Sequence, residues 1–251
     1  LFFTELNKKE IVFKKCNLFF LDDQKNRVVF ENFNLNETFK NNIHYINSES
    51  LFSENKLKVK FKNIINGEKK LDIKLPQINT TINVLFDQKS SLEDIRGKSK
   101  IKLVDNIVVL NFIGKEKFKI YESFLRNKYL NSKIDGEVSL FKNFFFDLNL
   151  DINQINLRKF LFSYFPEDKR HEILNSGISK KINGKINVQV KQTNSFIGRV
   201  KDLKMSLIFE NGDLRIKEGT ANLPHDSNIK FDLLFSDNLK NPYLDFSLKF
   251  Y

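Results

Sequence analysis

Strict alternation of apolar and polar residues recurs from one end of the chain to the other. Residues 56–62 read Lys-Leu-Lys-Val-Lys-Phe-Lys, and residues 244–250 read Leu-Asp-Phe-Ser-Leu-Lys-Phe. Residues 144–152 alternate in the same way. A period of two places the apolar side chains on one face of a strand and the polar ones on the other. The pattern therefore predicts a mainly β fold: an elongated, curved antiparallel sheet with one apolar and one polar face.

The turn residues between the alternating runs predict a series of hairpins. Two strands within residues 9–39 flank a polar turn, and an Asn-Gly pair separates strands at 55–65 and 70–75. Residues 40–54 are polar and are expected to form a loop. Further strands are predicted at 80–86, 95–104, 106–113, 117–120, 134–141, 143–152, 181–191, 196–210, 213–217, 228–235 and 243–250.

Residues 157–177 depart from the period of two. Apolar residues recur there at intervals of three and four, beginning with Leu157 and Phe160, which is helical spacing. We therefore expect a short helical insert over 157–177, between N-terminal strands in residues 1–156 and C-terminal strands in residues 178–251.

A short sequence pattern recurs along the chain and places glycine within three of the predicted strands. Gly136 and Gly184 stand in the same context, Ile-x-Gly-x-(Val/Ile), and Ile95-Arg96-Gly97 opens in the same way. Glycine within a strand typically marks a β-bulge or a close approach of two backbones. Each of the three glycines is therefore expected to let the sheet bend.

The formal net charge is +11, from 42 Lys and Arg residues against 31 Asp and Glu residues. Such a charge suits an anionic partner, either nucleic acid or a membrane surface. However, the lysines are spread over many predicted strands without a dense basic tract. Lys, Asn, Ile and Phe are abundant and share A/T-rich codons, so codon bias would explain the charge equally well. No nucleic-acid partner is predicted.

The sequence holds no catalytic or metal-binding motif. His44, His171 and His225 lie in polar surroundings without metal-ligand spacing, and each is expected to be a solvated surface residue. Two carboxylate pairs, at 22–23 and 167–168, fall at predicted turns, where Asp is common for backbone reasons. A single cysteine excludes an intramolecular disulfide. The chain is therefore expected to be no enzyme and to hold no metal or cofactor.

The apolar stripes permit two interpretations. They are either the inner faces of a closed β-sandwich or the lining of an open groove for acyl chains. A lipid tail of ~16 carbons, at roughly 0.8 kcal/mol per CH₂, gains about 12 kcal/mol on leaving water. The residues expected to line such a groove are Leu57, Val59, Phe61, Leu71, Ile73, Phe144, Phe146, Leu148, Leu150, Phe231, Leu233, Phe246 and Leu248.

Several segments resemble the AsmA-like family of bacterial proteins, which includes the TamB and YhdP types. Residues 9–35 read as a strand, a short turn after Leu21, and a return strand that ends in Asn32-Phe33-Asn34-Leu35. Residues 145–161 are similar to the family's strand that ends in a short helix. Four further segments are similar to a later repeat of the family: residues 211–216, 221–224, 229–231 and 242–246.

The resemblance implies a repeating β-groove that transports phospholipid between the inner and outer membranes of Gram-negative bacteria and supports outer-membrane integrity. It implies a periplasmic protein anchored to the inner membrane, with acyl chains as ligands and no catalytic residues. Because the chain begins without Met and has no run of ~20 apolar residues, we expect a piece of a longer protein whose membrane anchor lies outside this segment. The alternatives are a closed structural or adhesive β-sandwich without ligand and a lipopolysaccharide-bridge-like β-jellyroll.

Overall fold

The described part of the chain is built almost entirely of β-strands. The computed structural model describes residues 10–21, 27–52, 55–65, 67–88, 90, 94–103, 105–139, 144–156, 159, 183–195, 198–223, 227–236 and 243–251. Within these ranges there are sixteen strands and one short 3-10 helix, which confirms the prediction of a mainly β fold. The chain divides into two compact units, Leu1–Lys115 and Glu116–Tyr251.

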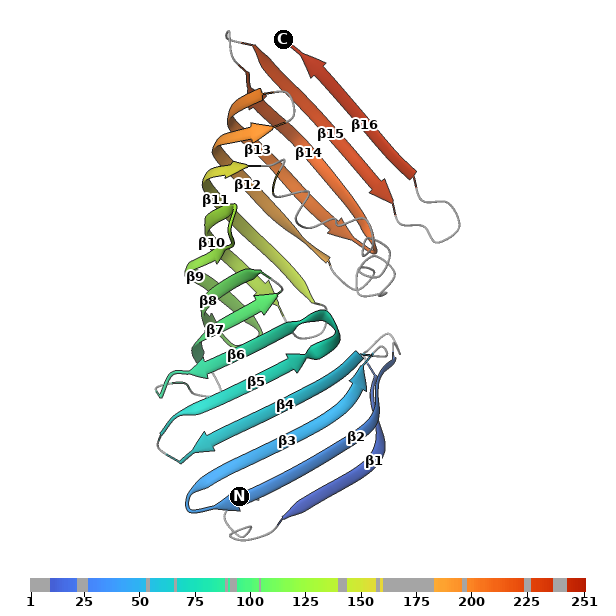
Figure 1. Cartoon of the computed structure of the whole chain (residues 1–251), viewed down its shortest axis with the longest axis vertical. Coiled ribbons are helices and arrows are strands. Elements are labelled where there is room, and N and C mark those ends of the chain that lie inside the picture. Colours follow the sequence, from blue (N-terminus) through green and yellow to red (C-terminus); the bar gives the residue numbers. More distant parts are fainter. Residues whose placement is uncertain are drawn as a thin grey trace. The chain divides into compact units, whose positions relative to one another are not determined.

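The first unit is an antiparallel meander in which each strand pairs with the next one along the chain (Figure 1). The 3-10 helix η1 (Pro76–Ile78) follows the fifth strand, which ends before Pro76 as expected from the missing N–H of proline. The strands are β1 (Ile11–Leu21), β2 (Arg27–Lys40), β3 (Ile43–Phe52), β4 (Asn55–Ile64), β5 (Lys69–Leu75), β6 (Thr80–Phe86), β7 (Ile95–Leu103) and β8 (Asn106–Gly114).

The prediction of a loop at residues 40–54 is wrong, because β3 occupies most of that segment. β3 pairs along its length with β2 and β4. Two positions on the apolar face of β3 are occupied by serine, Ser48 and Ser50. The sequence therefore does not alternate between apolar and polar residues there. Asn41 and Asn42 have φ angles of 51° and 61°, as a two-residue hairpin turn between β2 and β3 requires.

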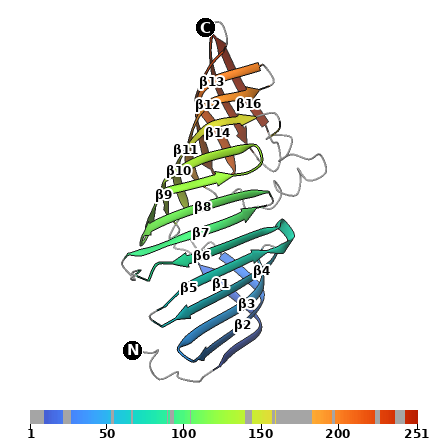
Figure 2. The same ribbon diagram turned by 60° about the vertical axis from the view of Figure 1, so that its left-hand side comes forward.

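The sheet of the first unit curls toward its N-terminal strands. The pairing of β1 with β2 shifts register twice, near Cys16, and the pairing of β2 with β3 shifts once, between Glu31 and Asn34. Such shifts are β-bulges, which bend and twist the bulged strand. In the rotated view β1 lies behind β4 and β5 (Figure 2).

The second unit is also a sheet in which strands that follow one another in sequence are neighbours. Its hairpins include a turn at Asn211 and Gly212, with φ angles of 53° and 96°, as predicted from the Asn-Gly pair. The strands are β9 (Lys117–Arg126), β10 (Leu130–Ser139), β11 (Phe145–Asn156), β12 (Asn183–Ser195), β13 (Gly198–Glu210), β14 (Asp213–Asn222), β15 (Asn228–Ser236) and β16 (Tyr243–Phe250).

One pair of strands in the second unit, β11 and β12, is parallel. Parallel neighbours need a crossover connection, and residues 157–182 make it. The helical insert predicted at 157–177 lies outside the described residues, apart from Lys159. The backbone N–H of Lys159 donates to Oδ1 of Asn156 at 3.0 Å, which is the arrangement of a helix N-cap. The insert stays a prediction.

Candidate functional site

On the apolar face of the first unit, one row of apolar residues crosses five strands without interruption. Residues directly opposite one another on paired strands share a face of the sheet. One row runs from β4 to β8 through Val59, Ile73, Ile82, Ile101 and Val108. All five side chains are half-buried and none is fully buried. The strands described for this unit therefore form an apolar surface that no second layer of described strands closes.

The apolar face of the second unit is covered unevenly. Ile152, Val190 and Leu203 lie opposite one another on β11, β12 and β13 and belong to a buried cluster. Nearer the other end of the same strands, Leu148 and Ile186 are only half-buried. This face is therefore buried at one end of the strands, whereas at the other end half-buried residues lie next to Phe146, which is buried.

The residues predicted to line a groove fall into two groups, one in each unit. Five share the apolar face of β4 and β5 in the first unit: Leu57, Val59, Phe61, Leu71 and Ile73. In the second unit, seven share the apolar face of β11, β15 and β16: Phe146, Leu148, Leu150, Phe231, Leu233, Phe246 and Leu248. Phe144 precedes β11 and is exposed, with its ring centroid 6.0 Å from that of Phe146.

The strands that continue these faces were predicted, but none of their residues was included among the predicted groove residues. β6, β7 and β8 extend the first face, and β12, β13 and β14 connect β11 to β15 in the second. The signal was present in the sequence, since residues 80–86 carry apolar side chains at every even position after Thr80. The residues missed include Ile82, Val84, Phe86, Ile101, Val108, Leu110, Ile186, Val188, Leu207 and Ile216.

Glycines on the apolar faces lie beneath phenylalanine rings of neighbouring strands. A Cβ on Gly97 would lie 2.7 Å from Cζ of Phe112, and one on Gly184 would lie 2.6 Å from Cγ of Phe146. Each pair faces across two hydrogen-bonded strands. The rings cover the exposed backbone and keep the face apolar where no side chain is present. The prediction of a close approach at these glycines is confirmed.

The prediction that His44 is a solvated surface residue is wrong, because its side chain lies on the apolar face of β3. Its Nε2 donates to Oε1 of Glu37 on β2 at 2.6 Å, and the exposed fractions of the two side chains are 17% and 24%. The imidazole meets the ring of Phe61 edge-on, with centroids 6.2 Å apart. His171 and His225 lie outside the described residues.

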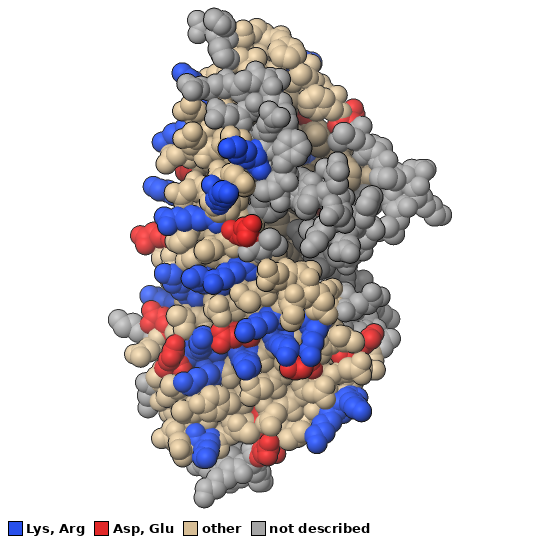
Figure 3. All heavy atoms as spheres, in the orientation of Figure 1, with Lys and Arg blue, Asp and Glu red and all other residues tan. Residues whose placement is uncertain are grey.

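The opposite face of the first unit is rich in lysine. Figure 3 shows Lys and Arg side chains gathered in rows on the face that is turned toward the viewer. Lys58 lies directly opposite Lys74, and Lys62 directly opposite Lys70. Like charges in such positions repel one another. The polar face therefore carries positive charge at some cost in stability.

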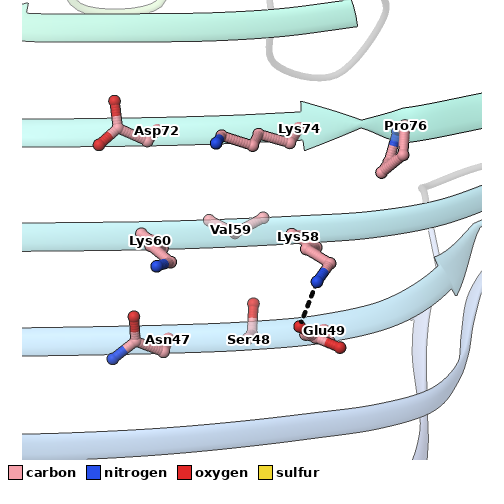
Figure 4. A pocket seen from close by; sticks show the side chains of 9 residues that line it. All are labelled: Asn47, Ser48, Glu49, Lys58, Val59, Lys60, Asp72, Lys74 and Pro76. Carbon is pink, nitrogen blue, oxygen red and sulfur yellow. Dashed lines mark ion pairs between the residues drawn. The ribbon is translucent and has the colours of Figure 1, made fainter. Parts of the chain in front are cut away.

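A hollow of about 390 Å³ lies on this polar face above β3, β4 and β5 (Figure 4). Lys58 donates to Glu49 at 2.9 Å, and Lys56 lies 3.3 Å from the same carboxylate. These bonds, from Lys58 first and then Lys56, hold the pKa of Glu49 below its usual range. The lining residues are Asn47, Ser48, Glu49, Lys58, Val59, Lys60, Asp72, Lys74 and Pro76. The hollow is a shallow mixture of paired charges and offers no nucleophile with an adjacent base.

The described residues provide no arrangement for metal chemistry. Within them, no three His, Cys, Asp or Glu side chains come together as a metal site would require. The carboxylate pairs at 22–23 and 167–168 lie outside those residues. In the same part of the chain, no helix has the length and apolar character needed to cross a membrane. The expectation that the chain is no enzyme stays a prediction.

No family model, curated protein or solved structure matches this chain. The resemblance to AsmA-like proteins therefore rests on the sequence segments quoted above.

Proposed function

We propose that this chain is part of an AsmA-like β-groove protein whose apolar sheet faces hold phospholipid acyl chains during transport between the inner and outer membranes. One observation carries the proposal. The row from Val59 to Val108 crosses five strands of the first unit and stays half-exposed throughout. A contiguous row of apolar side chains that stays accessible is typical of a surface that binds a ligand or partner.

The physical basis of the function is the transfer of hydrocarbon out of water. Each CH₂ of an acyl chain gains roughly 0.8 kcal/mol on an apolar surface. The contact is not directional, so a tail moves along the row without breaking specific bonds. No single apolar residue is therefore expected to be essential. In this proposal the chain acts in the periplasm, reaches the inner membrane through a segment outside it, and contacts no nucleic acid.

A closed sandwich without ligand is the main competing function. In a sandwich, inner-face side chains interdigitate with those of a facing sheet and become buried. The half-buried row of the first unit does not favour that arrangement. A lipopolysaccharide-bridge-like β-jellyroll would also present apolar faces, so the ligand itself has to be identified.

Two neighbouring residues on β6 provide a matched test. Val84 lies on the apolar face, opposite Leu71, whereas the side chain of Leu85 lies on the other face and is 43% exposed. In native mass spectrometry of the purified chain, we expect bound phospholipid in the unaltered protein and after Leu85→Asp. After Val84→Asp we expect roughly a tenfold or greater loss, because an unpaired carboxylate would have to be buried against the acyl chain.

Circular dichroism and thermal melting test whether both variants fold. Equal lipid occupancy in the two folded variants would overturn the groove assignment. Lipid-free protein with a cooperative melt would support the closed sandwich. Lipopolysaccharide in place of phospholipid would support the jellyroll function.

A further inference from the structure

Lysine side chains gather on the polar face of the first unit (Figure 3). β4 to β7 pair with one another without a register shift, so alternate residues of these strands lie on the same face. That face is opposite to the half-buried apolar row. The lysine face, as we name it, is defined by six side chains that have no ion-pair partner among the described residues: Lys60, Lys62, Lys74, Lys98, Lys100 and Lys102.

Two carboxylates of β3 and β5 share this side of the sheet, and both are engaged by lysines outside the set of six. Glu49 binds Lys58 at 2.9 Å and Lys56 at 3.3 Å, and Asp72 binds Lys70 at 3.3 Å. The positive charge of the lysine face is therefore not compensated by an ion pair in the described part of the chain, which costs stability. Codon bias explains how many lysines the chain has, but it does not explain their accumulation on one face.

Exposed apolar side chains lie between the lysines. Leu85 on β6 is flanked by Lys70 and Lys98 on the neighbouring strands and is 43% exposed. Ile107 on β8 lies opposite Lys102 and is 36% exposed. The surface thus combines the two attractions that hold a peripheral protein on a membrane, which are the electrostatic attraction to anionic lipid and the burial of apolar area.

A nucleic acid is the other polyanion that this charge would attract, and the composition of the lysine face does not favour it. All six side chains are lysines, whereas arginine is the side chain that matches phosphates and base edges with two hydrogen bonds. On the same side of β4 to β7, the described residues include no aromatic ring on which a base would stack. A lysine ammonium group is a compact point charge on a flexible stem, which suits a fluid layer of headgroups.

We propose that the lysine face docks on a membrane surface that contains anionic phospholipid. The ammonium groups of the six lysines lie at the level of the lipid phosphates, and Leu85 and Ile107 enter the boundary between headgroups and acyl chains. This docking leaves the apolar row on the opposite face uncovered. The inference goes beyond the proposed function, because it concerns a different face, and it stands or falls independently of acyl-chain binding.

Cosedimentation with vesicles tests the inference on the purified chain. Vesicles of phosphatidylcholine alone are compared with vesicles in which about a third of the lipid is phosphatidylglycerol, at about 100 mM NaCl. We expect at least about tenfold tighter binding to the anionic vesicles. The triple variant Lys74→Gln/Lys100→Gln/Lys102→Gln should weaken that binding by about ten- to a hundredfold. Leu85→Gln should weaken it by about three- to tenfold without a change in charge.

The matched control removes the same charge from the second unit. Lys191, Lys201 and Lys217 are exposed on β12, β13 and β14, and replacing all three with Gln lowers the net charge equally. This control should weaken binding to the anionic vesicles by less than about threefold. Circular dichroism tests whether each variant folds. Should the first triple variant fail to fold, its three single substitutions decide the outcome, since each is expected to weaken binding by about fivefold.

Three results would overturn the inference. Equal weakening by the two triple variants would assign the binding to the net charge of the molecule. Equal binding of the unaltered chain to both kinds of vesicle would show that anionic headgroups are not recognised. Tighter binding of a single-stranded DNA than of anionic vesicles, lost in the triple variant of the lysine face, would assign that face to a nucleic acid.

Discussion

Gly136 on β10 occupies a position that no other residue fits. Its φ angle is 138°, and a Cβ there would lie 2.1 Å from the carbonyl oxygen of Asp147 on β11. Both the backbone conformation and the lack of space exclude a side chain. We expect Gly136→Ala to lower the free energy of unfolding by about 2–4 kcal/mol, as measured by urea unfolding followed by circular dichroism.

The neighbouring Asp135 provides the control for that substitution. Its carboxylate accepts a hydrogen bond from Asn149 at 3.0 Å on the exposed face. Asp135→Ala removes this bond and should cost less than about 1.5 kcal/mol. Equal losses in the two variants would contradict a special role for the glycine.

At the scale of single residues, the sequence assigned faces correctly only where the alternation was clean. Leu57 and Val59 were predicted on an apolar face and lie on one. His44 was misassigned because Ile43 and Ile46 are both apolar and lie on opposite faces of β3. Which of them faces inward is decided by register with β4, and register is a property of the paired strands rather than of one segment. The contact between His44 and Glu37 could not be predicted for the same reason.

At the scale of elements, the β4–β5 hairpin contains a repulsion that a substitution can relieve. Lys62 lies directly opposite Lys70, whereas Lys60 lies opposite Asp72. Lys62→Glu should therefore raise the free energy of unfolding by about 0.5–1 kcal/mol. Lys60→Glu makes the same chemical change two residues away and should lower it by a similar amount. Thermal melting at low salt measures both, and stabilisation by both variants would refute the pairwise explanation.

Strand positions were largely predictable, and two of the shortfalls coincide with β-bulges. β9 was predicted to end at residue 120, where the pairing with β10 shifts and Glu122 has a φ of 43°. β14 was predicted to end at residue 217, next to a shift in its pairing with β15 and a φ of 56° at Glu218. A bulge adds one residue to a strand and reverses the alternation beyond it. The period of two is lost at that point although the strand continues.

At the scale of the whole molecule, the sequence could not reveal how the faces are covered. A period of two is the same in parallel and antiparallel sheets, so the parallel pairing of β11 with β12 was not visible in it. The alternation also does not distinguish an open face from a closed one. The half-buried row of the first unit and the buried cluster of the second have similar patterns in the sequence.

The positive charge of the chain predicts a response of its stability to salt. With a net charge of +11 and lysines opposed across strands, repulsion within the folded state should exceed the attraction of its exposed ion pairs, which are individually weak. Raising NaCl from about 20 to about 200 mM shortens the screening length from about 20 to about 7 Å. We therefore expect the melting temperature to rise by a few degrees.

Lys62→Glu removes one repulsion and lowers the net charge by two, so it should reduce this dependence on salt. Lys60→Glu lowers the net charge equally but leaves the repulsion between Lys62 and Lys70 in place. If both variants lose the same share of the salt response, the net charge of the whole molecule is responsible. If Lys62→Glu loses distinctly more, the opposed lysines on β4 and β5 are responsible. A melting temperature that falls with salt in the unaltered chain would mean that ion pairs such as Lys58–Glu49 outweigh the repulsion.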